Sequence, residues 1–425
     1  MLIPSYALTS CSIGPQKALV CHVSHGNSSV TPLGSANVLQ AKVEMLMQVS
    51  NSGVMETTPV VLLSTADRHL TILRLSSVSD ADAMQVVATV DADSPVLSFV
   101  ALQQRFIVYT TISGLITVYD AIDHKIISKR KDHAKYGVQI ISAPSPIHDR
   151  KSLNSIFLAT AGWDRKILLY LLQTDREIIE LEEPIATIEL TSLPESILFK
   201  VDERDNTLYI VCSRRDSTFL YYYRVCGNDA ETYQLELAGK QNLAPHANSW
   251  NAFSPSCLSA CPTDPTLIAV ATSSMPSMKA LVVRLLFPAI AQPSLVGASS
   301  PSSTSLARTE VATTTGSADA VSIQQAREDA AVLFHCNTLV GQTLYSLPVV
   351  AWRPDGCGIW VNSEDGIIKG IDMSGKIVCQ LRGGHDAGIK IRSLWAGNLT
   401  DGSERRECLL SGGFDGRLVL WTTPD

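Results

Sequence analysis

The chain has 425 residues, of which 45% are hydrophobic, and a formal net charge of −7. This content provides material for a core, and with only 18% charged residues the chain is not disordered throughout. Because no basic face or long basic run is present, we expect no direct nucleic-acid binding. No apolar run approaches the roughly 18 residues of a membrane span. The ten cysteines form no CxxC pair and no signal peptide is visible, so we expect reduced thiols in the cytoplasm or nucleus.

Short β-rich runs follow one another along the chain. Most are four to six residues long and end at Gly, Asp, Ser or Pro, which is typical of an all-β chain with tight turns. In chain order they include residues 60–63, 70–75, 106–111, 115–119, 156–160, 167–171, 208–212 and 418–421. A helical pattern is present, weakly, at residues 320–333 alone.

The runs belong to an internal repeat. In its clearest copies a strand, a turn containing Asp and a second strand are followed by an aromatic residue six positions after the Asp. The clear copies are centred on Asp164, Asp216 and Asp415, and the weaker ones on Asp67, Ser113 and Asp365. From Asp67 to Asp216 the successive centres lie 46, 51 and 52 residues apart. This period is slightly longer than the roughly 40–45 residues of a propeller blade, and the surplus falls in loops.

The repeats predict one seven-bladed β-propeller over residues 1–425. Its inner strands are expected at roughly residues 41–49, 95–100, 137–142, 196–201, 256–261, 347–352 and 388–395. The last blade ends at Trp421 on its third strand, so we expect the N-terminal run 18–23 to supply the fourth strand and close the ring. Residues 288–322, rich in Ser, Thr, Ala and Pro, predict a flexible insertion within blade five.

Two repeats carry a His, a Ser or Thr, an Asp and an aromatic residue at matching positions. They are His385, Ser411, Asp415 and Trp421 in the last repeat, and His133, Thr160, Asp164 and Tyr170 in the third. In this set the sequence resembles the WD40-repeat family. The resemblance implies that the four side chains form a hydrogen-bonded tetrad within one blade, because a buried carboxylate needs donors. Blade five, near Met275, lacks the Asp.

The same resemblance suggests where partners bind. In WD40 propellers the turn that carries the Asp lies on the face commonly used for partners. Trp163, Phe414 and Arg215 precede the turn Asp in three blades, and Arg165 and Arg417 follow it in two. Aromatic residues and Arg are enriched at binding hot spots, so these five residues are our candidates for partner binding. The alternative, that each ring simply packs over a neighbouring turn, stays open.

We therefore expect a non-catalytic protein–protein interaction scaffold within a cytoplasmic or nuclear complex, without cofactor or metal. The sequence contains no GxSxG elbow, Gly-rich phosphate loop or GxGxxG, and nothing in it implies a homo-oligomer. One alternative is a reader of peptides or modified histones, with a cage drawn from Trp163, Phe414, Trp250 and Trp395. Another is a propeller enzyme with a site in the central channel, which would need clustered carboxylates or histidines there.

Overall fold

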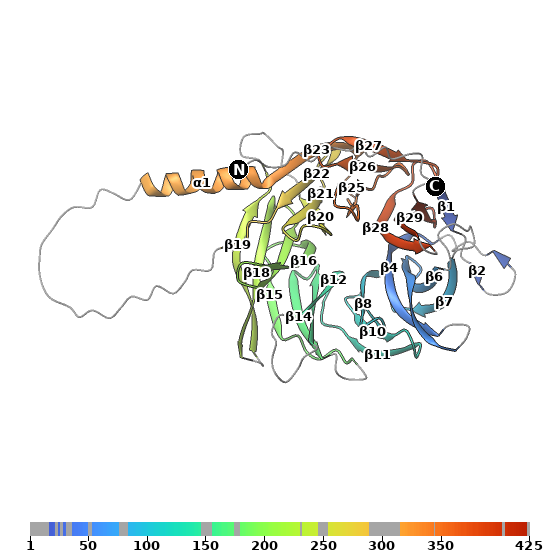
Figure 1. Cartoon of the computed structure of the whole chain (residues 1–425). Coiled ribbons are helices and arrows are strands. Elements are labelled where there is room, and N and C mark those ends of the chain that lie inside the picture. Colours follow the sequence, from blue (N-terminus) through green and yellow to red (C-terminus); the bar gives the residue numbers. More distant parts are fainter. Residues whose placement is uncertain are drawn as a thin grey trace, which may run out of the picture.

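The computed structural model is a ring of seven β-sheets, so the all-β, seven-bladed propeller is confirmed (Figure 1). The structure describes residues 17–21, 24, 25, 29, 30, 36–49, 53–75, 84–145, 155–173, 179–229, 232–244, 254–288, 315–343, 345–401 and 404–422. No helix in these ranges is long and apolar enough to cross a membrane.

Within a blade, consecutive strands pair antiparallel. Blade one contains β4 (Val38–Val49), β5 (Met55–Thr65), β6 (His69–Leu75) and β7 (Met84–Asp91), extended by β2 (Ser24–His25) and β3 (Ser29–Val30). Blade two contains β8 (Val96–Leu102), β9 (Phe106–Thr111), β10 (Ile116–Asp120) and β11 (Lys125–Arg130). Blade three contains β12 (Gly137–Pro144), β13 (Ser155–Gly162), β14 (Lys166–Gln173) and β15 (Ala186–Glu189). Blade four contains β16 (Pro194–Asp202), β17 (Thr207–Arg214), β18 (Phe219–Asp229) and β19 (Thr232–Asn242).

The remaining blades follow the same order. Blade five contains β20 (Pro255–Ala260), β21 (Leu267–Thr272), β22 (Ser277–Arg284) and β23 (Val332–Gly341). Blade six contains β24 (Val350–Trp352), β25 (Gly358–Val361), β26 (Ile368–Asp372) and β27 (Ile377–Leu381). Blade seven contains β28 (Ile391–Asp401), β29 (Glu404–Gly413) and β30 (Leu418–Thr422), and β1 (Lys17–Cys21) pairs with β30 at its outer edge.

The one helix among the described residues, α1 (Thr315–Ala331), directly precedes β23 and extends outward from the disc (Figure 1). It overlaps the end of the predicted insertion 288–322, and residues 289–314 of that insertion lie outside the described ranges. The helical stretch predicted at 320–333 was therefore misplaced at both ends. Ala, Gln, Arg and Glu favour the helix, and β pairing claims residues from Val332 onward. Glu328 accepts a hydrogen bond from the backbone N–H of Asn242 at 3.0 Å, which ties α1 to blade four.

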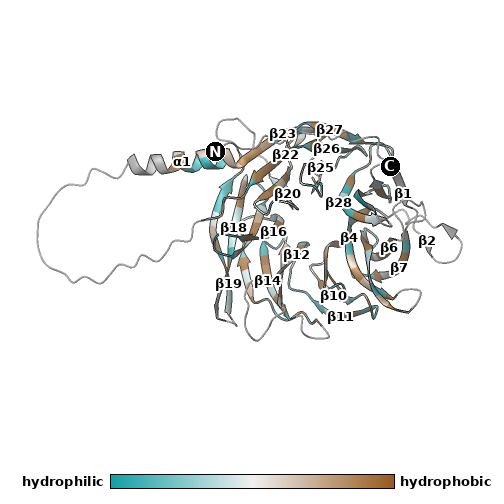
Figure 2. Cartoon of the chain, viewed as in Figure 1, coloured by the Kyte–Doolittle hydropathy of each residue, from teal (hydrophilic) through white to brown (hydrophobic). Residues whose placement is uncertain are grey.

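The hydrophobic core lies between neighbouring blades. Side chains of blade one, such as Val61 and Leu63, share a buried cluster with Leu410 and Leu420 of blade seven. Blades two and three meet in the same way. The middle strands of the blades are buried on both faces, so their sequences are continuous apolar runs. For example, all six residues of β9 are buried. Figure 2 shows these hydrophobic residues along the strands of the blades.

Hydrogen bonds also join the inner strands around the channel. At several junctions a side chain near the start of one inner strand accepts a hydrogen bond from a backbone N–H of the next inner strand. The pairs are Ser98 with Ile140 at 3.2 Å, Gln139 with Ile197 at 2.7 Å, Ser196 with Leu258 at 3.2 Å and Ser393 with Ala41 at 2.8 Å. The last pair joins blade seven to blade one across 352 residues of sequence. These bonds fix the rim of the channel, where the candidate site lies.

Candidate functional site

Blade seven contains a complete chain of four polar side chains. Trp421 Nε1 donates to Ser411 Oγ at 2.8 Å, and His385 Nε2 lies 2.8 Å from the same oxygen. His385 Nδ1 lies 3.1 Å from both carboxylate oxygens of Asp415. Since a carboxylate can only accept, Nδ1 donates to Asp415 and Nε2 accepts from Ser411. Burial lowers the pKa of His385, although the Asp415 carboxylate opposes this shift.

Blade three forms the corresponding histidine contacts, but its aromatic residue has a different hydrogen-bond partner. His133 Nε2 lies 2.8 Å from Thr160 Oγ1, and its Nδ1 lies 3.0 Å from Asp164 Oδ1. The hydroxyl of Tyr170, however, donates to Asp132 at 3.0 Å. Burial raises the pKa of the Asp164 carboxyl, but hydrogen bonds from His133 and from backbone N–H groups outweigh it and leave that pKa lowered. Tyr170 therefore links this blade to Asp132, outside the predicted tetrad.

A glycine two residues before each tetrad Asp makes room for the histidine. A Cβ added at Gly162 would lie 2.4 Å from His133 Nδ1, and one added at Gly413 would lie 2.7 Å from His385 Nδ1. Any side chain there would displace the imidazole. The glycines in Gly162-Trp163-Asp164 and Gly413-Phe414-Asp415 are therefore a sequence signal of the tetrad that the sequence analysis missed.

Trp163 is half-buried and contacts side chains from two blades. Its ring stacks on Tyr136 with centroids 4.8 Å apart, and the guanidinium carbon of Arg215 lies 5.0 Å from its centroid. Arg215 also forms an ion pair with Glu195, whose side chain is only 9% exposed. Burial raises the pKa of Glu195, and the charge of Arg215 opposes that rise. Trp163, Arg215 and Glu195 thus form one half-buried cluster between blades three and four.

Phe414 has a similar neighbour on blade seven. The guanidinium carbon of Arg392 lies 5.2 Å from the centroid of its ring. Among the described residues, no hydrogen bond or ion pair reaches this guanidinium. Burial lowers the pKa of Arg392 to about 10, although Glu364 opposes the shift. Glu364 is itself paired with Lys390 at 2.8 Å.

The other candidates from the sequence differ in their surroundings. Arg165 is exposed in a left-handed turn with φ of 64°, whereas Arg417 pairs with Asp386 at 2.7 Å. In blade four Asp216 is exposed. The adjacent Arg214 instead lies buried, with its guanidinium carbon 3.6 Å from the centroid of the Tyr221 ring. The repeat centred on Asp216 therefore uses an arginine–tyrosine contact where blades three and seven use a histidine.

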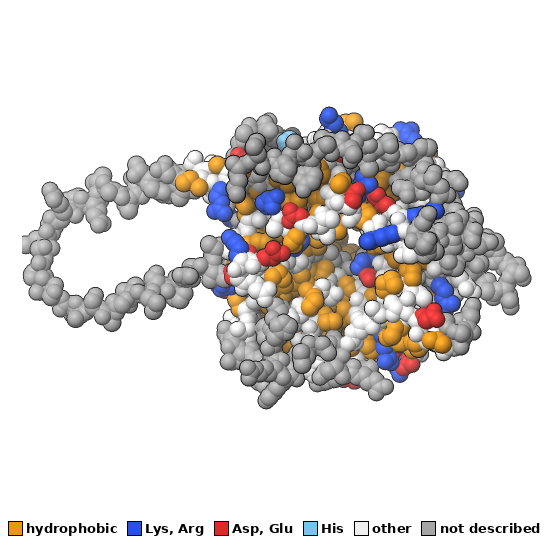
Figure 3. Space-filling view, in the orientation of Figure 1, with side chains coloured by type: hydrophobic (Ala, Val, Ile, Leu, Met, Phe, Trp, Pro, Cys, Tyr) orange, Lys and Arg blue, Asp and Glu red, His pale blue; other side chains and the backbone are white. Residues whose placement is uncertain are grey.

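A cavity of about 330 Å³ opens at one end of the central channel. All seven blades contribute to its lining, through residues at or just before the start of their inner strands. Its charged lining residues are Lys42, Glu195 and Arg392. We call it the mouth, and the face around it, which carries the turns at residues 163–166, 214–217 and 414–417, the turn face. The space-filling view shows the disc hollowed at its centre (Figure 3).

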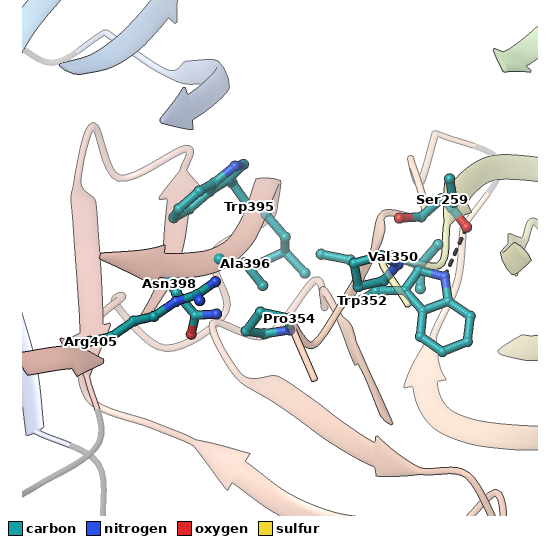
Figure 4. A pocket seen from close by; sticks show the side chains of 13 residues that line it. Ser259, Val350, Trp352, Pro354, Trp395, Ala396, Asn398 and Arg405 are labelled. Atoms are coloured by element: carbon teal, nitrogen blue, oxygen red, sulfur yellow. Dashed lines mark hydrogen bonds between the residues drawn. The ribbon is translucent and has the colours of Figure 1, made fainter. Parts of the chain in front are cut away.

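A second cavity, of about 450 Å³, lies toward the other end of the channel between blades five, six and seven (Figure 4). Trp395 lines both cavities. Asn398 and Arg405 face this lower cavity from blade seven, and Trp352 donates from Nε1 to the carbonyl of Ser259 at 2.9 Å. That bond ties blade six to blade five. The lower cavity is thus lined by groups that join neighbouring blades.

The residues suggested for an aromatic cage are distributed around the ring. Trp163 lies on blade three and Phe414 on blade seven, which are not neighbours, and Trp395 lies in the channel wall. Trp250 lies outside the described residues. Within the described ranges, no group of three or more His, Cys, Asp and Glu side chains is placed to hold a metal ion.

Exposed apolar residues on the turn face were missed by the sequence analysis. They are Met275, exposed at 55%, Leu339 at 68%, Tyr345 at 83% and Leu347 at 42%. The backbone N–H of Gln342 donates to the carbonyl of Pro276 at 2.9 Å, which brings the end of β23 beside the turn of Met275. We call these four residues the apolar sector. No repeat motif marks them, because they lie in a turn, a strand end and the link between blades five and six.

The fold and the comparison with known families agree. The family model described as UCP007778, beta-propeller domain matches residues 31–421. The chain belongs to this family. A comparison with curated proteins finds no significant match. In this UCP007778 propeller, the matched range includes both tetrads, the mouth and the apolar sector.

Proposed function

We propose that this UCP007778 propeller is a WD40-type, non-catalytic scaffold that binds other proteins through its turn face, within a complex of the cytoplasm or nucleus. The WD40 assignment is supported by the hydrogen-bonded sets in blades three and seven. In blade seven the chain runs from Trp421 through Ser411 and His385 to Asp415. Only those two blades carry the motif, so the proposal extends a pattern of two blades to the whole ring.

The observation that carries the binding proposal is the apolar sector. Four large apolar side chains, exposed at 42–83%, lie in neighbouring turns and links of blades five and six. Exposed apolar side chains gathered on one face favour an interaction site, because their burial against a partner removes apolar surface from water. The rigid blades beneath them limit the ordering entropy that binding must overcome.

The test compares matched variants on the two faces. The double change Tyr345→Ala with Leu347→Ala alters the turn face, and Val54→Ala with Met55→Ala alters the hairpin at the other end of the blades, where exposure is 56% and 44%. Tagged full-length proteins are used for affinity capture and quantitative mass spectrometry. We expect the captured amount of the main partners to fall tenfold or more with the turn-face variant and to stay unchanged with the control. Equal retention by both variants, with unchanged melting, would overturn the proposal.

We also propose that the N-terminal strand closes the ring. The support is the register of β1 with β30, in which Leu19 lies opposite Leu420 and Val20 opposite Val419. Without β1, the edge of β30 would present unpaired backbone groups. Removal of residues 1–22, which deletes β1 but keeps β2 and β3, should lower the melting temperature and promote aggregation, whereas removal of residues 1–14, which keeps β1, should not. Equal melting of the two truncated proteins would contradict this closure.

A further inference from the structure

We propose that Arg392, at the mouth, anchors the carboxylate of an acidic side chain in an extended peptide of a partner protein. The inference rests on the proposed function and names the class of ligand that the turn face takes. It follows from the position of Arg392 in the ring, from its lack of a counter-ion and from the surface beside it.

Arg392 occupies a position that recurs around the ring. In six inner strands the register with the second strand shifts by one residue near the start, which leaves one residue of the inner strand unpaired. These residues are Leu39, Leu97, Val138, Glu195, Ser256 and Arg392, and all of them line the mouth. In blade six Pro348, just before β24, lines it too. The fold needs no charge here, because uncharged residues occupy this position in four of the six strands.

The two charged members of this ring differ in their pairing. Glu195 is neutralised by Arg215. Lys42, the third charged residue of the mouth, pairs with Glu44. Arg392 has no such partner among the described residues, and the carboxylate whose charge acts on it, Glu364, is engaged by Lys390. Among the described residues that line the mouth, Arg392 is therefore the cation without an ion pair.

The positive charge of Arg392 lies in a partly buried environment that disfavours it. Burial disfavours the ionised form of Arg392 and lowers its pKa to about 10, so at neutral pH the side chain stays charged at the expense of folding. The Phe414 ring lies against the guanidinium, and Arg392 is one of the residues that line the mouth. A carboxylate matches the paired N–H groups of a guanidinium and would compensate the charge.

The surface beside the mouth favours a peptide over a small anion. Pro348 and Val349 line the mouth and continue directly from Tyr345 and Leu347 of the apolar sector. A chain that buries apolar side chains on this sector thus reaches Arg392 within a few residues. The cavity of about 330 Å³ is larger than one carboxylate requires and has Leu39, Leu97 and Val138 among its lining residues.

Selection from a peptide library tests the proposal. Full-length protein is used to select from random 12-residue peptides displayed on phage, and the enriched sequences are made as fluorescein-labelled peptides with amidated C-termini. Each is compared with a form in which the acidic residue is the corresponding amide. The proteins are wild type, Arg392→Gln, Arg392→Lys and the control Arg382→Gln, which alters an exposed arginine on the same face.

We expect enriched peptides to share an Asp or Glu next to apolar residues. Affinity should fall tenfold or more for the amide peptide and for Arg392→Gln, fall less for Arg392→Lys and stay unchanged for Arg382→Gln, with melting intact in all. Peptides without an acidic preference, binding that needs a free C-terminus, or equal affinity for Arg392→Gln would each overturn the acidic anchor while leaving the scaffold function standing. Failure to select any peptide would also overturn it, and the capture experiment would then decide the scaffold function separately.

Discussion

Blades three and seven present the same local motif with different consequences. Each has an aromatic residue before the tetrad Asp and an arginine against that ring. At Trp163 the arginine, Arg215, belongs to blade four and is neutralised by Glu195. At Phe414 the arginine, Arg392, belongs to the same blade and has no ion pair among the described residues. The motif thus carries an ion-paired arginine in one place and, among the described residues, an arginine without an ion pair in the other.

The tetrads differ in a related way. In blade seven Trp421 donates into the set at Ser411, so the chain of hydrogen bonds closes within the blade. In blade three Tyr170 donates to Asp132, which is also paired with Arg130 at 2.9 Å. The Tyr170 hydroxyl thus links the ion pair of Arg130 and Asp132 to blade three. In blade seven, by contrast, the indole of Trp421 completes the tetrad.

Loss of the tetrad carboxylates should have the largest effect. Asp415→Ala removes the acceptor of His385 and of the backbone N–H groups of Asp386 and Arg417. The free energy of unfolding should fall by about 3 kcal/mol, because several buried donors are left without partners. Asp164→Ala should cost a similar amount, since Asp164 has matching contacts. Urea denaturation measures both, and an unchanged midpoint would show that the network contributes nothing.

Substitution of the aromatic residue in each set should lower the stability by different amounts in blades seven and three. Trp421→Phe removes the hydrogen bond to Ser411 and leaves a small void, so we expect a loss of about 2 kcal/mol. Tyr170→Phe keeps the ring and removes the hydroxyl that donates to Asp132, which predicts a loss of about 1 kcal/mol. Melting curves of the two variants, with the fold checked by circular dichroism, test this order. A larger loss for Tyr170→Phe would mean that blade three depends more on its terminal hydrogen bond.

Arg215→Gln should destabilise the protein in a pH-dependent manner. Without Arg215 the buried Glu195 loses the charge that opposes its raised pKa. A folded-state pKa above the unfolded value favours folding at low pH, and this stability is lost as the pH rises through the folded-state pKa. The deficit should be about 1–2 kcal/mol at pH 8, because Arg215 is partly exposed, and should shrink toward pH 4. Arg165→Gln is the matched control, and a deficit that does not vary with pH would contradict the role of Glu195.

Arg392→Met should change the free energy of unfolding in the opposite direction, and by a small amount. The lowered pKa of Arg392 means that its charge opposes folding at every pH below about 10. Its removal should raise the free energy of unfolding at pH 7 by about 1 kcal/mol. Urea denaturation is suitable because urea does not screen charge. If this variant loses stability as Arg215→Gln does, the contrast between the two arginines disappears.

The sequence by itself determined the seven-bladed β-propeller and the approximate positions of its inner strands, and it predicted the His, hydroxyl and Asp side chains that meet in blades three and seven. The physical reason is that these features lie within one repeat. Alternating strands and tight turns recur with one period, and His385 and Asp415 are separated by only 30 positions. Spacing of this kind is visible without a structure.

Only the tertiary structure decided which groups meet across blades. Ring closure brings Ser393 to Ala41 over 352 positions and sets Arg392 in the same mouth as Glu195. The contact of Arg215 with the Trp163 ring likewise depends on how blade four packs against blade three. No pattern within a repeat records them, because the contacts between blades are set by packing across the ring and not by the period of the chain.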